Sequence, residues 1–477
     1  MRTVSQGNRR AYPYNHSSPR PAFRSVSTLI VLAGVVAVLT ASVVDRPELV
    51  LAAVVALLFV GASVWNPRIA LVAYAVTLPF EGLVLSDGPV PTVTKAAAIV
   101  FAVSYLIRVG TNLDRRSLPI WLWLWFMWAA MSLLWGEHEA IGSVLTLAQV
   151  LLVALLMADF ARREGQSLAR DAMWAYSLAV AVVAAISLIG FVNEGYTGGY
   201  ARFTAFETQK LADLSGTLVL GLAFLVCVFA GLVESSRRAR VVAAASAPIV
   251  AAAMLVTGTR SAWLASLGIV AVVALSARWK AAPAISALIL TSMVLLVLAP
   301  GLTQSLEDRV KSALPSGGSG RTEVWSAAID FFDYNPVLGL GYGNFQPSVA
   351  QAATIEYVDA PTFIPSGRRI APHSIYVGSL VELGFVGFVL LGFAIGSLFL
   401  PRLRGTPQYL EICVFALLIY AAFHDSQASK YLWLPVALLA GSRTFCRQTG
   451  HAAQAAPTTN RAATHSRHRG GQALDIR

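Results

Sequence analysis

Long apolar runs recur along the chain from residue 26 to about residue 442, and short polar segments separate them. The runs are about 17–22 residues long and show no period-2 alternation, which favours membrane-crossing helices over barrel strands. The pattern predicts an all-α fold, a polytopic transmembrane helix bundle of about 12–14 spans. Whether the short runs 68–82 and 429–443 cross the whole bilayer stays open. The expected spans are 26–44, 48–64, 68–82, 94–109, 118–135, 141–160, 171–192, 211–233, 240–257, 261–278, 281–300, 373–400, 408–424 and 429–443.

The longest interruption of this pattern is the polar segment 301–372, which is expected to be one long extracytoplasmic loop. Inside it, apolar residues recur at helical spacing and predict one amphipathic helix. Ser319 is expected to cap this helix, and a glycine-rich stretch, Asn335–Phe345, is expected to end it. The helix is expected to lie along the membrane surface or to pack on the bundle. The apolar stripe consists of Val324, Trp325, Ala328, Ile329, Phe331 and Phe332.

Composition supports a membrane protein, because 56% of the residues are hydrophobic and only 13% are charged. With the N-terminus inside, most of the 36 Lys and Arg residues fall in cytoplasmic segments, as the positive-inside rule requires. The net charge of +11 is therefore a topology signal, and nothing in it favours nucleic acid as a partner. We expect a multi-pass membrane protein with both termini in the cytoplasm. The expected organisation is a basic tail at 1–25, a transmembrane bundle at 26–300, the loop at 301–372, further spans at 373–443 and a disordered cytoplasmic tail at 444–477.

Three polar residues are expected at helix starts on the outer face: Arg260, Arg321 and His373. Pro372 suits a first helical position, with His373 directly after it. Cations are unfavourable at helix N-termini unless an anion binds there, so the two arginines indicate a phosphate or pyrophosphate site. A histidine at a helix start is held toward its neutral form, which accepts a proton. Each residue alone is also explained as an interfacial anchor or a hydrogen-bonded structural residue; the three together on one face support a functional site.

Further candidates for substrate binding lie on the same face or just below it. Arg368 and Arg369 precede His373, and either bind substrate or solvate the loop. Glu382 is expected about two and a half turns below His373 in the same span, as a buried carboxylate that an arginine would pair with. The remaining candidates are Arg202 and Tyr376.

The sequence contains none of the HExxH, Cys/His or DxD patterns that would indicate a metal site, and no nucleotide signature. We therefore expect no metal and no cofactor. An enzyme of this kind needs a substrate that arrives already activated in the membrane.

Three blocks resemble the signature of a known family: "TGTRSAWLA", "SGRTEVWSAAIDFFDYNPVLGLGYGNF" and "PHSIYVGSLVELGFVGF". Their order and spacing resemble the O-antigen ligase / Wzy-type O-antigen polymerase family over about residues 240–400. The family has a ligase branch and a polymerase branch that share these blocks. One difference is local, since the family often has Asn where this chain has Ser374.

The resemblance implies a metal-independent membrane glycosyltransferase. It would move a polyprenyl-pyrophosphate-linked glycan onto an acceptor hydroxyl on the outer face of the cytoplasmic membrane, with inversion at the anomeric carbon. By the same resemblance, Arg260 and Arg321 hold the pyrophosphate and His373 is the general base. Expected partners are the lipid-linked donor, a glycan or lipid acceptor, membrane lipids and, for a polymerase, a chain-length regulator.

A lipid-linked glycan transporter or flippase is the alternative from another class. It would place charged residues near the membrane midplane and show related halves, and the sequence has neither feature. A structural subunit of envelope assembly is a third alternative, in which none of the three polar residues matters singly. The sequence does not decide whether the protein is a ligase or a polymerase. It also leaves open the sugar, the acceptor and the oligomeric state.

Overall fold

The structure is a computed structural model, and it describes residues 57–81, 92–110, 112–136, 140–194, 211–233, 236–277, 286, 321–345, 348, 371–401, 403, 405–424 and 427–455. Across these residues the secondary structure is helical and no strand occurs, which confirms the all-α prediction. Both chain ends lie outside the described residues. So does most of the long loop, including the expected helix cap Ser319.

The helices follow the predicted apolar runs to within a few residues at most ends, but the last helix continues to Ala455, so residues 444–455 are helical and not the disordered tail expected there. Their bounds are α3 Pro67–Thr77, η1 Leu78–Phe80, α4 Val93–Val109, η2 Arg115–Ser117, α5 Ile120–Met131, η3 Ser132–Leu134, α6 Ala140–Glu164, α7 Gln166–Glu194, α8 Leu211–Phe229, α9 Arg237–Thr257, α10 Arg260–Ala277, α13 Arg321–Tyr334, α15 Ile375–Phe399, α16 Gln408–Ala421 and α17 Lys430–Ala455.

Four of the described helices are long and apolar enough to cross a membrane: Ala140–Glu164, Gln166–Asn193, Arg237–Thr257 and Ile375–Phe399. Several shorter apolar helices accompany them, including α8, α10 and α16. The chain is therefore an integral membrane protein, while the number of spans stays a prediction because only part of the chain is described.

The chain divides into two compact units. The first holds the residues up to Ala70 together with Ile99–Thr111, and the second holds Leu71–Ala98 and Asn112–Arg477. In the first unit, Arg108 donates from Nη1 to the carbonyl oxygen of Trp65 at 2.9 Å. All described candidate site residues belong to the second unit.

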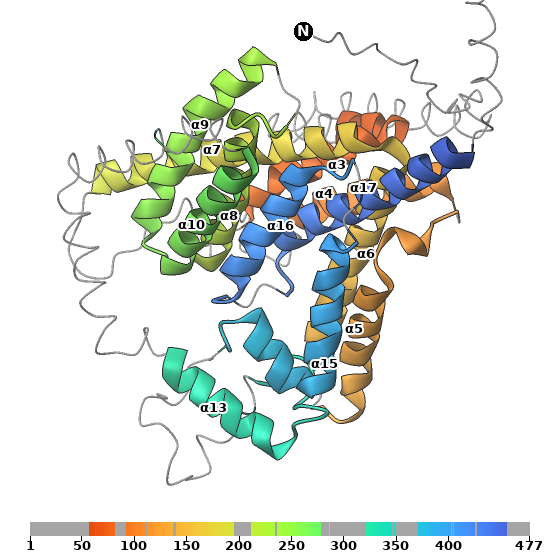
Figure 1. Ribbon diagram of the computed structural model, residues 1–477, viewed down its shortest axis with the longest axis vertical. Helices are drawn as coiled ribbons and strands as arrows, with labels where there is room; N and C mark the ends of the chain where they lie inside the picture. Colours follow the sequence, from red (N-terminus) through yellow and green to blue (C-terminus); the bar gives the residue numbers. More distant parts are fainter. Residues whose placement is uncertain are drawn as a thin grey trace, which may run out of the picture. The chain divides into compact units, whose positions relative to one another are not determined.

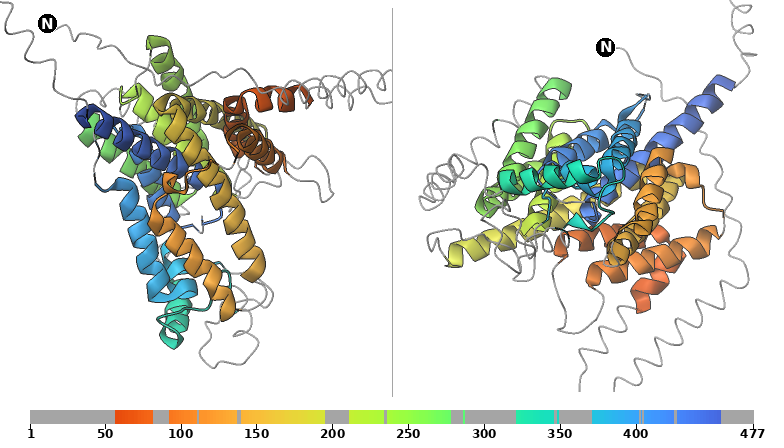
Figure 2. Two further views of the ribbon diagram at one scale, coloured as in Figure 1. Left: turned by 90° about the vertical axis from the view of Figure 1, so that its right-hand side faces the viewer. Right: turned by 90° about the horizontal axis from the view of Figure 1, so that it is seen from below.

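The core of the second unit is built around α8 and α16. α8 packs against α7, α9, α10 and α16, and its side chains from Leu218 to Val228 are buried almost without interruption. Such all-round burial is what an apolar helix in the middle of a bundle requires. A second group of helices, α5, α6 and the later part of α15, lies side by side in Figures 1 and 2.

The predicted span 373–400 corresponds to α15, which is long and apolar enough to cross a membrane but is broken at Gly384. This glycine has φ 66° and ψ −172°, a conformation that essentially only glycine adopts. The break divides α15 into a short helix over 375–383 and a longer helix over 385–399 (Figure 1). The two parts do not form one straight helix. The apolar run in the sequence is therefore longer than either straight helix that it forms.

The glycine-rich stretch 335–345 closes this break. Leu340 N donates to Val381 O at 3.0 Å and Gly341 N donates to Glu382 O at 2.7 Å. These carbonyls would otherwise lack helical partners in a buried region, which is costly. The indole of Trp128 does the same for Leu383, whose carbonyl oxygen accepts at 2.9 Å.

Close backbone contact explains why glycines are needed there. A Cβ on Gly339 would lie 2.5 Å from Gly384 N, and a Cβ on Gly384 would lie 2.2 Å from Val337 O. The two chain segments therefore approach at a distance that only glycine permits. The stretch Asn335–Phe345, which the sequence predicts to end a helix, therefore also supplies hydrogen bonds to α15 at its break.

The predicted amphipathic helix is α13, and it packs on the short first part of α15. Ala328 is fully buried with Phe345 and Val381, and other stripe residues pack around this cluster. Ile329 of the apolar stripe does not join this cluster, since its side chain is 56% exposed. The helix turns this residue away from α15, beside the exposed Asp330.

Candidate functional site

Arg260 begins α10, as the sequence predicts. Gly258 ends α9 in the left-handed conformation with φ 62°, which allows the tight turn between the two helices. Thr259 and Ser215 of α8 share a hydrogen bond of 2.8 Å between their buried hydroxyls. This contact ties the start of α10 to the bundle core and leaves the half-buried Arg260 at a fixed helix N-terminus.

The start of α10 is also joined to the end of α16. Ser261 Oγ lies 2.7 Å from His424 Nε2, and the ring of His424 stacks on Tyr420 with centroids 4.3 Å apart. The hydrogen bond and the stack fix the residues that follow α16. Arg260 is next to Ser261, so its position depends on this contact.

Arg321 begins α13, again as predicted. Its guanidinium carbon lies 5.8 Å from the centroid of the Phe423 ring, a cation–π distance. Trp325, one helical turn later, stacks on the same ring at 6.4 Å with an interplanar angle of 27°. Phe423 thus orients the first turn of α13, and its neighbour His424 contacts the first turn of α10.

His373 lies beside this cluster, but not at the position expected. Ser374 is the N-cap of α15 and its side chain accepts from Val377 N at 3.3 Å, so the helix begins at Ile375. The prediction that Pro372 takes the first helical position is therefore wrong. A serine caps a helix by the same hydrogen bond that an asparagine would make, which explains the Ser374 difference from the family pattern.

The backbone of His373 is held in an unusual conformation. Its φ is 50°, a left-handed value that non-glycine residues seldom adopt. Trp325 Nε1 donates to Pro372 O at 3.0 Å and so fixes the preceding residue. The strained backbone therefore holds a partly exposed imidazole next to α13.

Partial burial lowers the pKa of His373 from its usual 6.5, and the nearby charge of Arg321 lowers this pKa further. The imidazole is therefore neutral at neutral pH. A neutral imidazole accepts a proton from a hydroxyl, which is the protonation state that a general base needs.

The structure thus brings Arg260, Arg321 and His373 together around the residues that end α16. The start of α10 lies beside His424 and the start of α13 lies beside Phe423, and each start carries orphan backbone N–H groups and an arginine. This arrangement attracts an anion that carries several negative charges, and it places a neutral base beside it. Whether these residues perform those roles stays a prediction.

The other candidates differ in how they are placed. Tyr376 donates from its hydroxyl to Leu418 O at 3.1 Å, which ties α15 to α16 near the cluster. Glu382 is buried at the break of α15, and its Oε1 accepts from Phe345 N at 3.3 Å. Glu382 lies in the unbroken first part of α15 and is buried, as expected, and the helix breaks two residues after it. Arg202, Arg368 and Arg369 lie outside the described residues.

Sequence analysis missed four residues that organise the site: Ser261, Tyr420, Phe423 and His424. In the sequence these residues resemble ordinary span ends, because aromatic residues and histidine are common at membrane interfaces. The signal available was the cluster of Tyr420, Phe423 and His424 within one turn on the same face as the arginines.

The described part of the chain is that of an all-helical membrane protein. Residues 245–392 match the family model described as O-antigen ligase. That range contains Arg260, Arg321 and His373, so the resemblance to the O-antigen ligase family is confirmed over this part of the chain. It supports a membrane enzyme of the O-antigen ligase/polymerase type. A search of curated proteins finds no match.

Proposed function

We propose that the protein is a membrane glycosyltransferase that moves a glycan from a polyprenyl-pyrophosphate carrier to a hydroxyl on the outer face of the cytoplasmic membrane. The observation that carries this proposal is the meeting of two arginine-bearing helix starts and a neutral histidine around Phe423. The O-antigen ligase match over the same residues favours this reaction class.

In the proposed reaction, His373 takes the proton from the acceptor hydroxyl while its oxygen attacks the anomeric carbon. The bond between that carbon and the pyrophosphate oxygen breaks, and the carbon inverts. The departing pyrophosphate gains negative charge, which Arg260, Arg321 and the two helix N-termini stabilise. The donor is already activated. The chain's own residues therefore need only position the two substrates, deprotonate the acceptor hydroxyl and stabilise the departing pyrophosphate.

A transporter is disfavoured by the placement of the charged groups. Arg260 and Arg321 begin helices and His373 precedes one, near the end of α16, whereas a transporter would hold its substrate near the bilayer midplane. His373→Ala separates the two possibilities, because a transferase would lose most turnover and a transporter would keep most transport.

The test is complementation of a strain that lacks the gene, with surface and lipid-linked glycans separated on a gel. Wild type restores the glycan pattern, while His373→Ala and Arg321→Ala fail to restore it although the protein reaches the membrane. Arg240→Ala, a charge removal at the exposed start of α9, is the matched control and restores the pattern. Full restoration by Arg321→Ala contradicts the proposed pyrophosphate clamp.

The same gel separates the two branches of the family. An acceptor that carries a single repeat unit in the deletion strain indicates a polymerase. A bare acceptor, with long chains still on the polyprenyl lipid, indicates a ligase. A normal pattern in the deletion strain contradicts both.

A further inference from the structure

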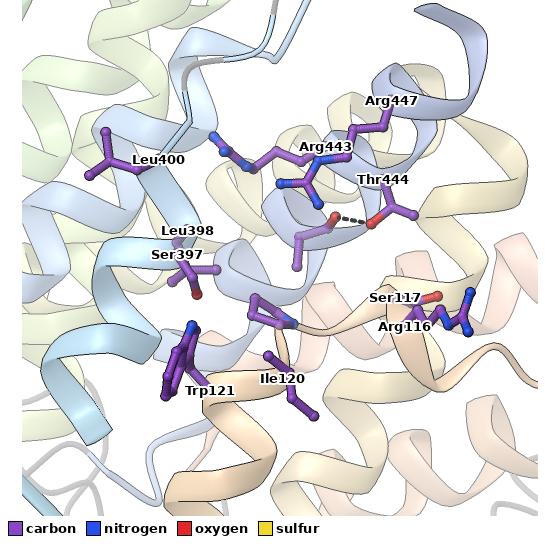
Figure 3. Close-up of a pocket in the computed structure, with 12 residues that line it drawn as sticks. Arg116, Ser117, Ile120, Trp121, Ser397, Leu398, Leu400, Arg443, Thr444 and Arg447 are labelled. Carbon is purple, nitrogen blue, oxygen red and sulfur yellow. Dashed lines mark hydrogen bonds between the residues drawn. The ribbon is translucent and has the colours of Figure 1, made fainter. Parts of the chain in front are cut away.

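A second basic site lies at the other end of the helices that build the candidate site. α16 runs from Gln408 to the cluster around Phe423, and α17 runs back from Lys430 toward Arg443 and Arg447. At 1.5 Å per residue, Arg443 lies about 20 Å along α17 from its start. A pocket of about 280 Å³ opens there, on the face that the charge pattern predicts to be cytoplasmic (Figure 3).

Three arginines line this pocket: Arg116 of η2, and Arg443 and Arg447 of α17. The two residues of α17 are four apart, so they lie on the same helix face one above the other, and both reach toward the pocket in Figure 3. Cations this close repel one another, and an anion between them relieves the repulsion.

Arg443 is only 3% exposed and is only partly satisfied by the protein. Its Nη2 donates to Pro401 O at 2.6 Å, which fixes the guanidinium. Its buried Nη1 forms an ion pair with Glu411 Oε1 at 3.6 Å but has no hydrogen-bond partner within the described part of the chain. A buried guanidinium N–H without a hydrogen-bond partner is costly, so this atom indicates a missing acceptor.

The hydroxyl groups at the pocket are already engaged. Ser117 donates to Asp159 at 3.2 Å, and Thr444 donates to Ala440 O at 3.1 Å. The carboxylates nearby are engaged as well, since Asp159 pairs with Arg162 and Arg163. Glu411 offsets part of one charge, and the pocket lining stays positive.

The other half of the lining is apolar and is continuous with an exposed apolar surface. Ile120 is 64% exposed and Leu400 is 68% exposed, and Trp121 stacks on Phe393 with centroids 4.7 Å apart. Phe393, in the later part of α15, is itself exposed, so an apolar surface continues along α5 and α15 from the pocket. A ligand that fills this site has an anionic head and an apolar chain.

We propose that this pocket binds the phosphate of an anionic phospholipid from the leaflet on this face, separately from the proposed catalytic site. Arg443 and Arg447 would contact the phosphate, Arg116 would close over it, and the acyl chains would lie on Trp121 and Leu400. Arginine matches phosphate oxygens with paired N–H donors, and a free phosphate would leave the apolar half of the pocket unused.

Binding is measured by native mass spectrometry of the full purified chain with phosphatidylglycerol or phosphatidylcholine. The test variant is Arg116→Gln/Arg447→Gln, since both side chains are exposed and their loss spares the fold. Arg237→Gln/Arg240→Gln at the exposed start of α9 removes equal charge from the same predicted face and is the control. We expect wild type to prefer phosphatidylglycerol and the test variant to bind it roughly twenty-fold more weakly, at about five-fold per arginine.

The control pair should bind phosphatidylglycerol within about two-fold of wild type. Equal weakening in both double variants contradicts the proposal, because it would show a general attraction of the surface. Equal binding of phosphatidylcholine also contradicts it. Inorganic phosphate that displaces the lipid as effectively as added phosphatidylglycerol would instead show a site for a free anion.

A second measurement does not depend on the arginine variants. Phosphatidylglycerol with brominated chains should quench the fluorescence of Trp121, taken as the difference between wild type and Trp121→Phe. Equal quenching in the two proteins would place the lipid elsewhere. Activity of the proposed transferase is not needed for either readout, so failure of one proposal leaves the other standing.

Discussion

The indole of Trp325 donates a hydrogen bond of 3.0 Å to the carbonyl oxygen of Pro372, and this contact holds His373 next to the first turn of α13. The two residues are far apart in the sequence, and most of the loop between them is not described. The Trp325 side chain therefore adds a direct link between Arg321 and His373 to the packing of α13 on α15.

The first prediction concerns this hydrogen bond. Trp325→Phe keeps a ring to stack on Phe423 but loses the donor, so turnover should fall about three- to ten-fold, the loss expected for one hydrogen bond. Trp123→Phe is the matched control, because its indole donates to Arg115 O at 3.3 Å, away from the site. Glycan transfer by the purified protein gives the rates. Equal rates for the two variants would contradict a positioning role for Trp325.

The second prediction is a pH dependence. The pKa of His373 lies below its usual 6.5, so activity that needs the neutral imidazole persists as pH falls to that value and is lost only below the lowered pKa. Arg321→Gln removes a charge that lowers this pKa, and the acid limb should move to higher pH. Arg321→Lys keeps the charge and should leave the limb in place.

The residual rate of each Arg321 variant against pH tests this directly, and NMR titration of the His373 ring gives the pKa without any activity. A shift to lower pH in Arg321→Gln would show that Arg321 does not repel the protonated imidazole.

The third prediction concerns the contact between Ser261 and His424. His424→Phe keeps the stack on Tyr420 and Ser261→Ala keeps the helix, so each removes mainly the 2.7 Å hydrogen bond. Because this bond places the start of α10 and thus Arg260, each variant should raise the KM for the donor several-fold. The double variant should be no worse than either single one. Ser266→Ala, one turn further along α10, is the control, and additive effects in the double variant would argue against coupling.

The fourth prediction concerns the break in α15. Gly384→Ala should destabilise the protein by about 1–3 kcal/mol from backbone strain alone, before the clash with Val337 O is counted. Gly392→Ala in the same helix meets nothing within 4 Å and should be neutral or stabilising. The Tm of each variant, measured by thermal unfolding in detergent, tests this difference in stability. Equal Tm values would mean that α15 is straight in the native protein.

The fifth prediction separates a structural role of Glu382 from a chemical one. Its Oε1 accepts from Phe345 N, and the amide oxygen of glutamine can accept the same bond. Glu382→Gln should therefore keep both Tm and activity near wild type, while Glu382→Ala should lower Tm because a buried N–H loses its partner. Loss of activity in Glu382→Gln at normal Tm would instead show that the charge takes part in binding or catalysis.

Much of the fold could be predicted because lipid imposes simple constraints on sequence. Long apolar runs must become helices, since backbone polar groups in the bilayer need partners within their own segment. The positions of α6 to α10 and the start residues Arg260 and Arg321 follow from that rule and from the polar turns between the runs. The chemistry of two arginines at positive helix ends followed from the helix dipole alone.

The break at Gly384 was not predictable in this way, because its partners are distant in sequence. The run 373–400 is apolar throughout, and only the approach of 336–341 makes a left-handed glycine favourable there. The same holds for Pro372, which fits a helix start locally but precedes an N-cap at Ser374 in the folded chain.

The sequence by itself determined the all-helical membrane class, the polar residues at the helix starts and the resemblance that groups them, because each depends on local hydropathy, charge and motif spacing. Only the tertiary structure decided that Phe423 and His424 join the starts of α13 and α10, and that Glu382 accepts a backbone hydrogen bond. Contacts between segments far apart in the chain are set by how helices pack, and that packing is a property of the whole fold rather than of any one stretch.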